Sequence, residues 1–210
     1  MELRNKKILF LGDSITEGAG ASRTENSFVE VLRRSYGPEV VNYGIGGTRI
    51  ARQRRPSEIA QYDLDFGSRV PEMDPEADIV VVFGGTNDHG HGDAPLGTDS
   101  HRTADTFIGA CHCLYASLLE KYPHSRIVIL TPLHRAVESR SDGIMLKDYV
   151  NLIRAIAPQY GLPVLDLYGT SAIRADIPEI AEQLTVDGLH PNDAGHAILA
   201  KEIGEYLQKL

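Results

Sequence analysis

The chain has 210 residues, of which 42% are hydrophobic and 24% are charged, and its formal net charge is −8 at pH 7. This size predicts one globular domain over residues 1–210, and the acidic balance argues against a nucleic-acid binder, because phosphate contacts need an excess of Lys and Arg. No apolar run approaches the ~18–20 residues that span a bilayer, and the N-terminal basic residues precede a run too short for a secretory leader. We therefore expect a cytoplasmic protein with no membrane partner.

Short runs rich in Val, Ile and Leu alternate along the chain with longer amphipathic stretches, a pattern typical of a parallel sheet with helical crossovers. We predict five strands, at 7–11, 39–43, 78–83, 126–131 and 163–167. We predict five helices, at 27–36, 57–70, 104–121, 143–160 and 193–210. Asp193 is positioned to cap the last of these helices. The sequence thus predicts an α/β fold without repeats or linkers.

Two connections of the predicted fold are unusually long, 84–103 and 132–142, and both leave the carboxyl ends of strands. Long irregular loops are disproportionately functional, and open α/β sheets bind ligands at this edge. We expect the two loops to wall a pocket; whether they close over a substrate stays open. Cys111 and Cys113 stand two apart in a predicted helix, a spacing unsuited to a disulfide, so we expect reduced structural thiols.

Three residues have the chemistry of a serine hydrolase. Ser14 follows the first predicted strand in a glycine-flanked turn, where a lone serine would ordinarily cap a helix. Asp187 and His190 stand three residues apart in one loop before the last predicted helix. A serine nucleophile needs a base to take its proton, and the base needs a carboxylate to orient it. These types predict a catalytic triad, for which Asp166 is the alternative acid and is more simply explained as a turn or cap residue.

Donors for an oxyanion hole are available after the second and third predicted strands. The first of these turns is rich in glycine and holds Gly47, five residues after Asn42, and the second holds Asn87. Backbone N–H groups in a glycine-rich turn can approach a ligand closely, and an asparagine adds an amide donor. Taken singly, each turn is ordinary loop chemistry.

Taken together and in order, these segments resemble the four sequence blocks of the SGNH hydrolases, also called the GDSL esterase/lipase family, over nearly the whole chain. The resemblance implies that Ser14 is the nucleophile and that Asp187 and His190 complete the triad. It also implies an oxyanion hole formed by the backbone N–H groups of Ser14 and Gly47 and the side chain of Asn87. The implied fold is a flavodoxin-like three-layer α/β/α sandwich with a five-stranded parallel sheet in the order 2-1-3-4-5.

We accordingly expect a hydrolase that cleaves a small-molecule carboxylic ester through an acyl-enzyme, with no cofactor and no metal. The long loops are polar, which favours a short-acyl ester such as an O-acetylated carbohydrate. The residues expected to contact the substrate are Asp13, Asp88, His89 and His134. A lysophospholipase or thioesterase acting on longer chains is the alternative, and a catalytically silent protein that binds an acylated ligand is a third reading.

Two features leave more than one reading open. The segment from His89 to Asp93 holds metal-ligand residue types, but its neighbours are loop formers and the expected chemistry needs no ion. The basic run 49–55 is best explained as a solvated face, the alternative being contact with an anionic substrate group or a partner subunit. Association of identical copies is not readable from the sequence.

Overall fold

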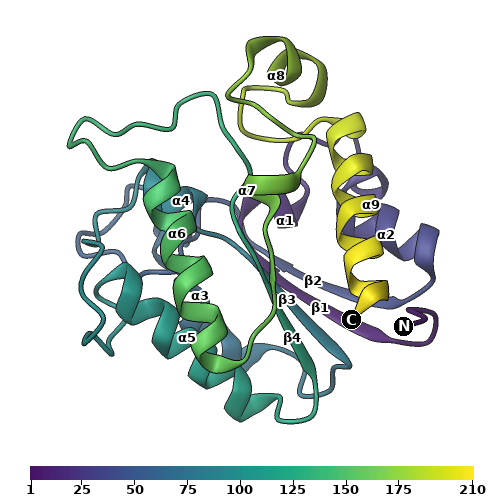
Figure 1. Cartoon of the computed structure of the whole chain (residues 1–210), viewed down its shortest axis with the longest axis horizontal. Coiled ribbons are helices and arrows are strands. Elements are labelled where there is room, and N and C mark those ends of the chain that lie inside the picture. Colours follow the sequence, from purple (N-terminus) through teal and green to yellow (C-terminus); the bar gives the residue numbers. More distant parts are fainter.

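The computed structural model describes all residues from 1 to 210 and contains one sheet of five parallel strands in the order β2-β1-β3-β4-β5 (Figure 1). The strands are β1 (Lys7–Gly12), β2 (Glu39–Gly44), β3 (Ile79–Phe83), β4 (Arg126–Leu130) and β5 (Val164–Leu165). Each predicted strand is present, and the predicted order is confirmed. β5 is shorter than predicted and pairs with β4 through two residues only.

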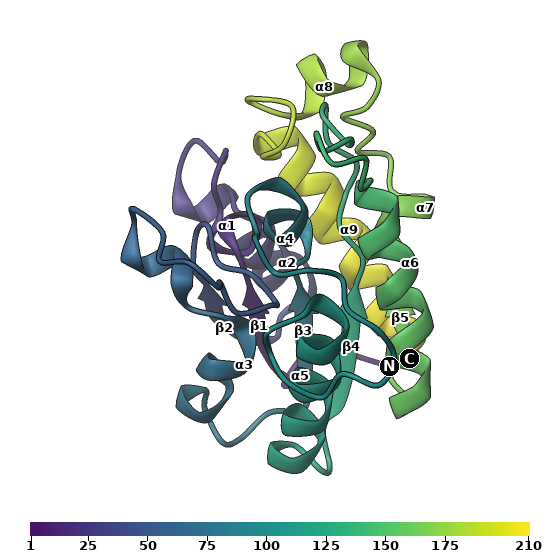
Figure 2. The same cartoon turned by 90° about the vertical axis from the view of Figure 1, so that its left-hand side faces the viewer.

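Helices cover both faces of the sheet, so the three-layer arrangement is also confirmed (Figures 1 and 2). The helices are α1 (Ser14–Glu17), α2 (Phe28–Tyr36), α3 (Phe66–Arg69), α4 (Thr86–Gly90), α5 (Phe107–Lys121), α6 (Leu146–Ile156), α7 (Leu167–Thr170), α8 (Pro178–Leu184) and α9 (Asp193–Lys209). Four short 3-10 turns complete the set: η1 (Thr24–Asn26), η2 (Ala60–Asp63), η3 (Val70–Glu72) and η4 (Ala157–Tyr160). No helix is long and apolar enough to span a membrane.

Alternate residues of each strand face opposite layers, which divides the apolar core in two. On one face, Ile8 and Phe10 of β1 pack with α2 and α9, which lie next to each other. On the other, Leu9 and Leu11 pack with α3, α5 and α6. Because both faces are buried, the central strands are apolar throughout rather than alternating.

The segment 57–70, predicted as one helix, is instead η2, an extended stretch and α3. Two carboxylates compete with helix formation here. Asp63 accepts hydrogen bonds from the backbone and hydroxyl of Ser57, and Asp65 caps α3 by accepting from the backbone N–H of Ser68. Local bonds of this kind favour turns over a continuous helix.

The cap predicted for the last helix is also wrong by one residue. Asn192 caps α9, its side-chain oxygen accepting from the N–H groups of Ala194 and Gly195. Asp193 lies within the helix and accepts instead from the backbone and hydroxyl of Ser22. Asp193 therefore joins α9 to the segment that precedes α2, and its neighbour Asn192 is the cap.

Two cysteines lie in α5, as predicted, and both are free thiols. Cys111 is buried and Cys113 is half-buried, and burial raises the pKa of each thiol. Both thiols are therefore protonated at neutral pH, and Cys111 packs in the core.

The strand register places the three turns of interest side by side. Gly12 at the end of β1 is level with Gly44 of β2 and with Phe83 of β3. The segments that follow these strands therefore leave the sheet next to one another. Figure 2 shows α1 and α4 at this same end of the molecule.

Candidate active site

Ser14 is the first residue of α1, and only Asp13 separates it from the end of β1. Asp13 caps this short helix, its carboxylate accepting from the N–H of Ile15 at 3.0 Å. A side chain at Gly12 would collide with Thr16, with 2.0 Å from the added Cβ to the Thr16 hydroxyl, so the turn requires glycine. The tight turn places the Ser14 side chain at the edge of the sheet with about 9% of the residue exposed.

A continuous pair of hydrogen bonds joins Ser14 to the C-terminal loop. The Ser14 Oγ lies 2.9 Å from Nε2 of His190, and Nδ1 of His190 lies 2.7 Å from Oδ2 of Asp187. The second carboxylate oxygen, Oδ1, accepts from the backbone N–H groups of Leu189 and His190. Burial raises the pKa of Asp187, but the hydrogen bonds from His190 outweigh burial and hold that pKa below its usual value. Asp187 is therefore an anion at neutral pH, aligned with the imidazole.

The alternative acid lies elsewhere. Asp166 caps α7, and both its carboxylate oxygens lie 2.6 Å from Nη2 of Arg154. Its carboxylate is thus engaged in an ion pair, whereas Asp187 is bonded to His190.

The loop of His190 packs closely against two other segments, and a glycine lies at each of these contacts. Gly20, with φ of +92°, passes so close that an added Cβ would lie 2.2 Å from the carbonyl oxygen of Pro191. Gly188, with φ of +77°, accepts from the N–H of Ala136 at 2.8 Å. The loop is thereby fastened to the segment after α1 on one side and to the loop 132–142 on the other.

The turn after β2 lies against the nucleophile. A Cβ at Gly46 would be 3.7 Å from the Cβ of Ser14, and the N–H of Gly46 donates to the Glu17 carboxylate. Gly47 has φ of +76°, and its N–H has no acceptor within the protein. An added Cβ there would lie 2.1 Å from the ring of Tyr62. Only glycine satisfies both the backbone angle and this close approach.

Asn87, in the first turn of α4, is oriented by the same segment. Its Nδ2 donates to the carbonyl oxygen of Thr48 at 3.0 Å, which identifies the nitrogen side of the amide and leaves its second hydrogen available. The side chain is 5% exposed. Residues 14, 47 and 87 thus come from the segments that follow three neighbouring strands.

Arg69 connects these strand ends and was missed by sequence reasoning. Its guanidinium donates to the carbonyl oxygens of Gly12 and Tyr43 and to the hydroxyl of Thr48. Burial lowers its pKa to about 10, opposed by the charge of Asp13, so the side chain stays cationic at neutral pH. No sequence signal singles out this arginine, because its partners are backbone atoms distant in the chain.

Asp13 and Asp88, predicted as substrate contacts, are both buried and accept hydrogen bonds from backbone N–H groups. Asp88 accepts from the N–H groups of Ile50 and Ala51 at 2.9 and 2.8 Å. Burial raises the pKa of Asp13 to about 7 and that of Asp88 to about 6. Their carboxylates stabilise the turns that surround the site.

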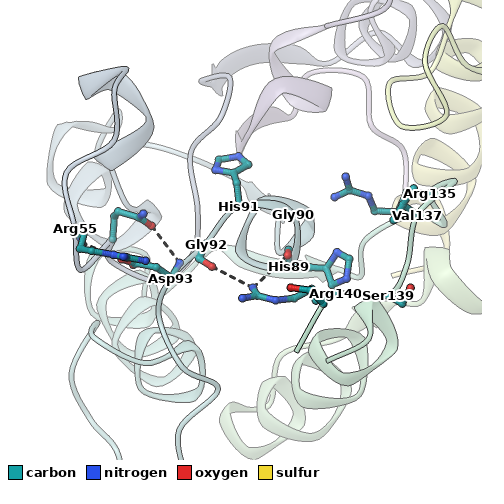
Figure 3. A pocket seen from close by; sticks show the side chains of 12 residues that line it. Arg55, His89, Gly90, His91, Gly92, Asp93, Arg135, Val137, Ser139 and Arg140 are labelled. Carbon is teal, nitrogen blue, oxygen red and sulfur yellow. Dashed lines mark hydrogen bonds and ion pairs between the residues drawn. The ribbon is translucent and has the colours of Figure 1, made fainter. Parts of the chain in front are cut away.

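The two predicted substrate-contact histidines lie in different surroundings. His134 stacks on Tyr168, with ring centroids 3.8 Å apart, and its Nδ1 lies 2.6 Å from Glu138. His89 lies in α4 and borders a cavity of about 470 Å³. Figure 3 shows this cavity. Its lining residues are Gln53, Arg55, His89, Gly90, His91, Gly92, Asp93, Arg135, Val137, Ser139, Arg140 and Ser141.

The cavity adjoins the triad without containing it. It begins where α4 continues beyond Asn87, and the Tyr62 ring that packs on Gly47 lies 5.5 Å, centroid to centroid, from the ring of His91. Its walls include parts of the loops 84–103 and 132–142, as expected. The basic run 49–55 is not simply a solvated face: Arg49 is buried, bonded to Tyr62 and His91, and Arg55 lines the cavity.

Comparisons with known proteins identify relatives of the chain. The sequence model of the GDSL-like lipase/acylhydrolase family matches residues 10–198. A GDSL lipase of Mycobacterium tuberculosis is 26% identical over 165 residues, 75% of this chain and 64% of the relative, so the match leaves about a third of that relative uncovered. A crystal structure of a protein from Lactobacillus plantarum is 30% identical with a TM-score of 0.86, covering 98% of both chains.

A further solved structure, of an acetyl xylan esterase, has a TM-score of 0.66 at 23% identity and covers 96% of this chain and 99% of its own. At that identity it is evidence for a shared fold. The sequence model of the family, by contrast, extends over most of the chain and includes all the residues assembled above. The chain therefore belongs to the GDSL-like lipase/acylhydrolase family.

Proposed function

We propose that the protein is a serine-dependent carboxylic ester hydrolase that works through an acyl-enzyme. The observation that carries the proposal is the hydrogen-bonded series from Ser14 through His190 to Asp187. A hydroxyl, a neutral imidazole and a carboxylate in this order form the proton-transfer unit of serine hydrolases.

In the first step His190 takes the proton of Ser14 through Nε2, and the Ser14 Oγ attacks the ester carbonyl carbon. Asp187 accepts the hydrogen bond of Nδ1–H and stabilises the imidazolium that forms. His190 then gives its proton to the departing alcohol. A water molecule, deprotonated by the same imidazole, then attacks the acyl group. As the bond between the acyl carbon and the Ser14 Oγ breaks, His190 returns the proton to the Oγ and the acid is released.

The negative charge on the carbonyl oxygen needs donors already in place. The N–H of Gly47 is free of protein acceptors, the amide of Asn87 is held by Thr48, and the N–H of Ser14 lies in a first helical turn, where donors lack helical partners. These three donors form the proposed oxyanion hole. No step requires a metal or an organic cofactor.

The proposed substrate has a short acyl group and a polar alcohol, such as an O-acetylated carbohydrate. Val137 is the one large apolar side chain among the residues that line the cavity. A long acyl chain would need an apolar groove, whereas hydroxyl groups suit the polar lining. The shared fold with an acetyl xylan esterase is consistent with this choice.

The test compares Ser14→Ala with the wild type on p-nitrophenyl acetate, butyrate and octanoate. We expect the variant to lose activity by a factor on the order of 10⁴ or more. Ser35→Ala, at an exposed position on α2, is the matched control and should retain full activity.

The acyl series separates the alternatives. A steep fall in kcat/KM from acetate to octanoate supports the short-acyl substrate, and a rise favours a lysophospholipase or thioesterase. Equal activity of wild type and Ser14→Ala would overturn the serine mechanism. If the wild type hydrolyses none of the three esters or an acetylated sugar, the protein is better described as a binder of acylated ligands.

A further inference from the structure

The cavity beside the triad is cationic, although the chain as a whole carries a net charge of −8. Three arginines line it, Arg55, Arg135 and Arg140, against one carboxylate, Asp93. A concentration of positive charge in a concave site of an acidic protein points to a negatively charged ligand.

Arg135 differs from the other two arginines in having no acidic partner. Arg55 pairs with Asp93, and Arg140 pairs with Asp142. The Nη1 of Arg135 donates to the carbonyl oxygen and hydroxyl of Thr86, while its Nε and Nη2 make no hydrogen bond within the protein. Figure 3 shows this side chain pointing into the cavity.

The half-buried guanidinium of Arg135 has no direct counter-ion within the protein. Burial lowers its pKa, and the more distant charges of Asp187 and Glu138 raise it. A charge withdrawn from water without a direct counter-ion costs stability, and a bound anion would offset that cost. Its unused Nε and Nη2 form a planar edge that matches the two oxygens of a carboxylate or phosphate.

His89 forms part of the same cavity wall. The residue is 3% exposed, and both of its ring nitrogens are covered by neighbouring atoms. Burial and the charge of Arg135 lower its pKa, opposed by the backbone of Glu138. The ring is therefore neutral at neutral pH, and the positive charge of the cavity comes from its arginines.

The position of Arg135 is fixed relative to the reacting groups. Its Nη1 is bonded to Thr86, which directly precedes Asn87. The next residue, Ala136, donates its N–H to Gly188, which directly follows Asp187. An anion on Arg135 would therefore sit at a defined place beside both the oxyanion donors and the triad loop.

We propose that this cavity binds a carboxylate or phosphate group carried by the ester substrate, with Arg135 as its principal ligand. This inference rests on the proposed function and narrows it to acidic esters, for example acetylated sugars that bear a carboxylate or phosphate. Either the alcohol or the acyl portion of the ester can carry such a group.

The experiment measures kcat/KM on two pairs of esters of similar size, each with one anionic and one neutral member. The first pair, para-acetoxybenzoate and para-acetoxybenzamide, places the charge in the alcohol portion. The second, p-nitrophenyl hemiadipate and its methyl ester, places it in the acyl portion. We expect the wild type to prefer the anionic member of one pair by about tenfold or more, a range typical of hydrogen bonds to charged groups.

Arg135→Gln should bring the ratio of kcat/KM for the anionic ester to kcat/KM for its neutral partner close to one. The ratio cancels any general effect of the substitution on the triad. Arg33→Gln removes the same charge from an exposed position on α2 and should keep the wild-type ratio. A wild type that prefers neither anionic ester, or a preference that Arg135→Gln retains, overturns the inference while Ser14-dependent hydrolysis leaves the proposed function standing.

If none of the four esters is hydrolysed, calorimetric titration with inorganic phosphate and with adipate decides the matter. Binding to the wild type and its loss in Arg135→Gln would support the anion site without the hydrolase. Absence of binding would overturn it.

Discussion

At the scale of single residues, Asp187 has two separable roles, one in the loop and one toward His190. Its Oδ1 holds two backbone N–H groups, and its Oδ2 accepts from the imidazole. Asp187→Asn keeps an oxygen for the loop but offers an N–H to Nδ1, which turns the imidazole to the tautomer that cannot accept the Ser14 proton.

We predict that Asp187→Asn lowers kcat by ~10⁴-fold with little change in KM or in melting temperature. Steady-state kinetics on p-nitrophenyl acetate and a thermal melt check this. A loss of less than tenfold would mean that another carboxylate orients His190.

Asp13 is a buried acid whose charge state should govern stability. Burial raises its pKa from 3.8 to about 7. Between about pH 4 and pH 7 the folded protein therefore holds a proton that the unfolded chain has released, so raising the pH through this range destabilises the fold at this residue. Asn at this position keeps the oxygen that accepts from Ile15 and never ionises.

We predict that the stability of the wild type relative to Asp13→Asn falls as the pH rises from 4 to 7, by up to about 1.4 kcal/mol per pH unit. Urea unfolding of both proteins at several pH values measures this difference, in which the titrating groups that do not interact with Asp13 cancel. A difference that does not vary with pH would contradict the raised pKa.

Some site residues can be identified from a sequence pattern, whereas the roles of others depend on contacts with residues distant in the chain. The sequence singles out Ser14, Asp187 and His190, because the proposed chemistry requires those residue types in recognisable surroundings, and the structure joins the three by hydrogen bonds. Arg69 is not singled out in this way, since it bonds to backbone atoms that any neighbour supplies. Asp13 was predicted to contact the substrate, but it is buried and accepts a hydrogen bond from the backbone of Ile15, because of packing that no local pattern records.

At the scale of elements, the turn after β2 depends on a glycine for two reasons, its backbone angle and its contact with Tyr62. Gly161 offers a matched comparison, because its φ of +70° is similar to the +76° of Gly47 but an added Cβ would meet nothing within 4 Å.

We predict that Gly47→Ala lowers kcat by about 10²–10³-fold, as expected for a displaced oxyanion donor. Gly161→Ala should cost a similar backbone strain of about 1 kcal/mol and leave kcat unchanged. Kinetics and urea unfolding of both variants test this. Equal kcat in the two variants would exclude the N–H of Gly47 from the oxyanion hole.

The sequence predicts a strand or helix more reliably when more of its surface is buried. Strands β1, β3 and β4 are covered on both faces, so their apolar runs are continuous and unmistakable. The segment 57–70 has helical spacing but folds as short turns, because Asp63 and Asp65 bond to nearby backbone groups. Side-chain competition of this kind is local, but its outcome depends on the tertiary contacts around it.

For the whole molecule, the order of the strands explains where the site lies. β1 is flanked by β2 and β3, so the chain leaves the end of β1 between two other strand ends and opens the ligand-binding crevice typical of such sheets. Strand patterns alone do not specify neighbours, and the order was inferred from the family resemblance. Only the three-dimensional arrangement revealed that the long loops and the basic run enclose one cationic cavity.

The two partners of the Ser14–His190 hydrogen bond are separated by 176 positions in the chain. During synthesis the amino-terminal part of a protein leaves the ribosome first, so Ser14 emerges long before Asp187 and His190. A nascent chain that lacks their loop carries Ser14 as an ordinary alcohol. Under the proposed mechanism, the protein can therefore gain its activity only after nearly the whole chain has been made.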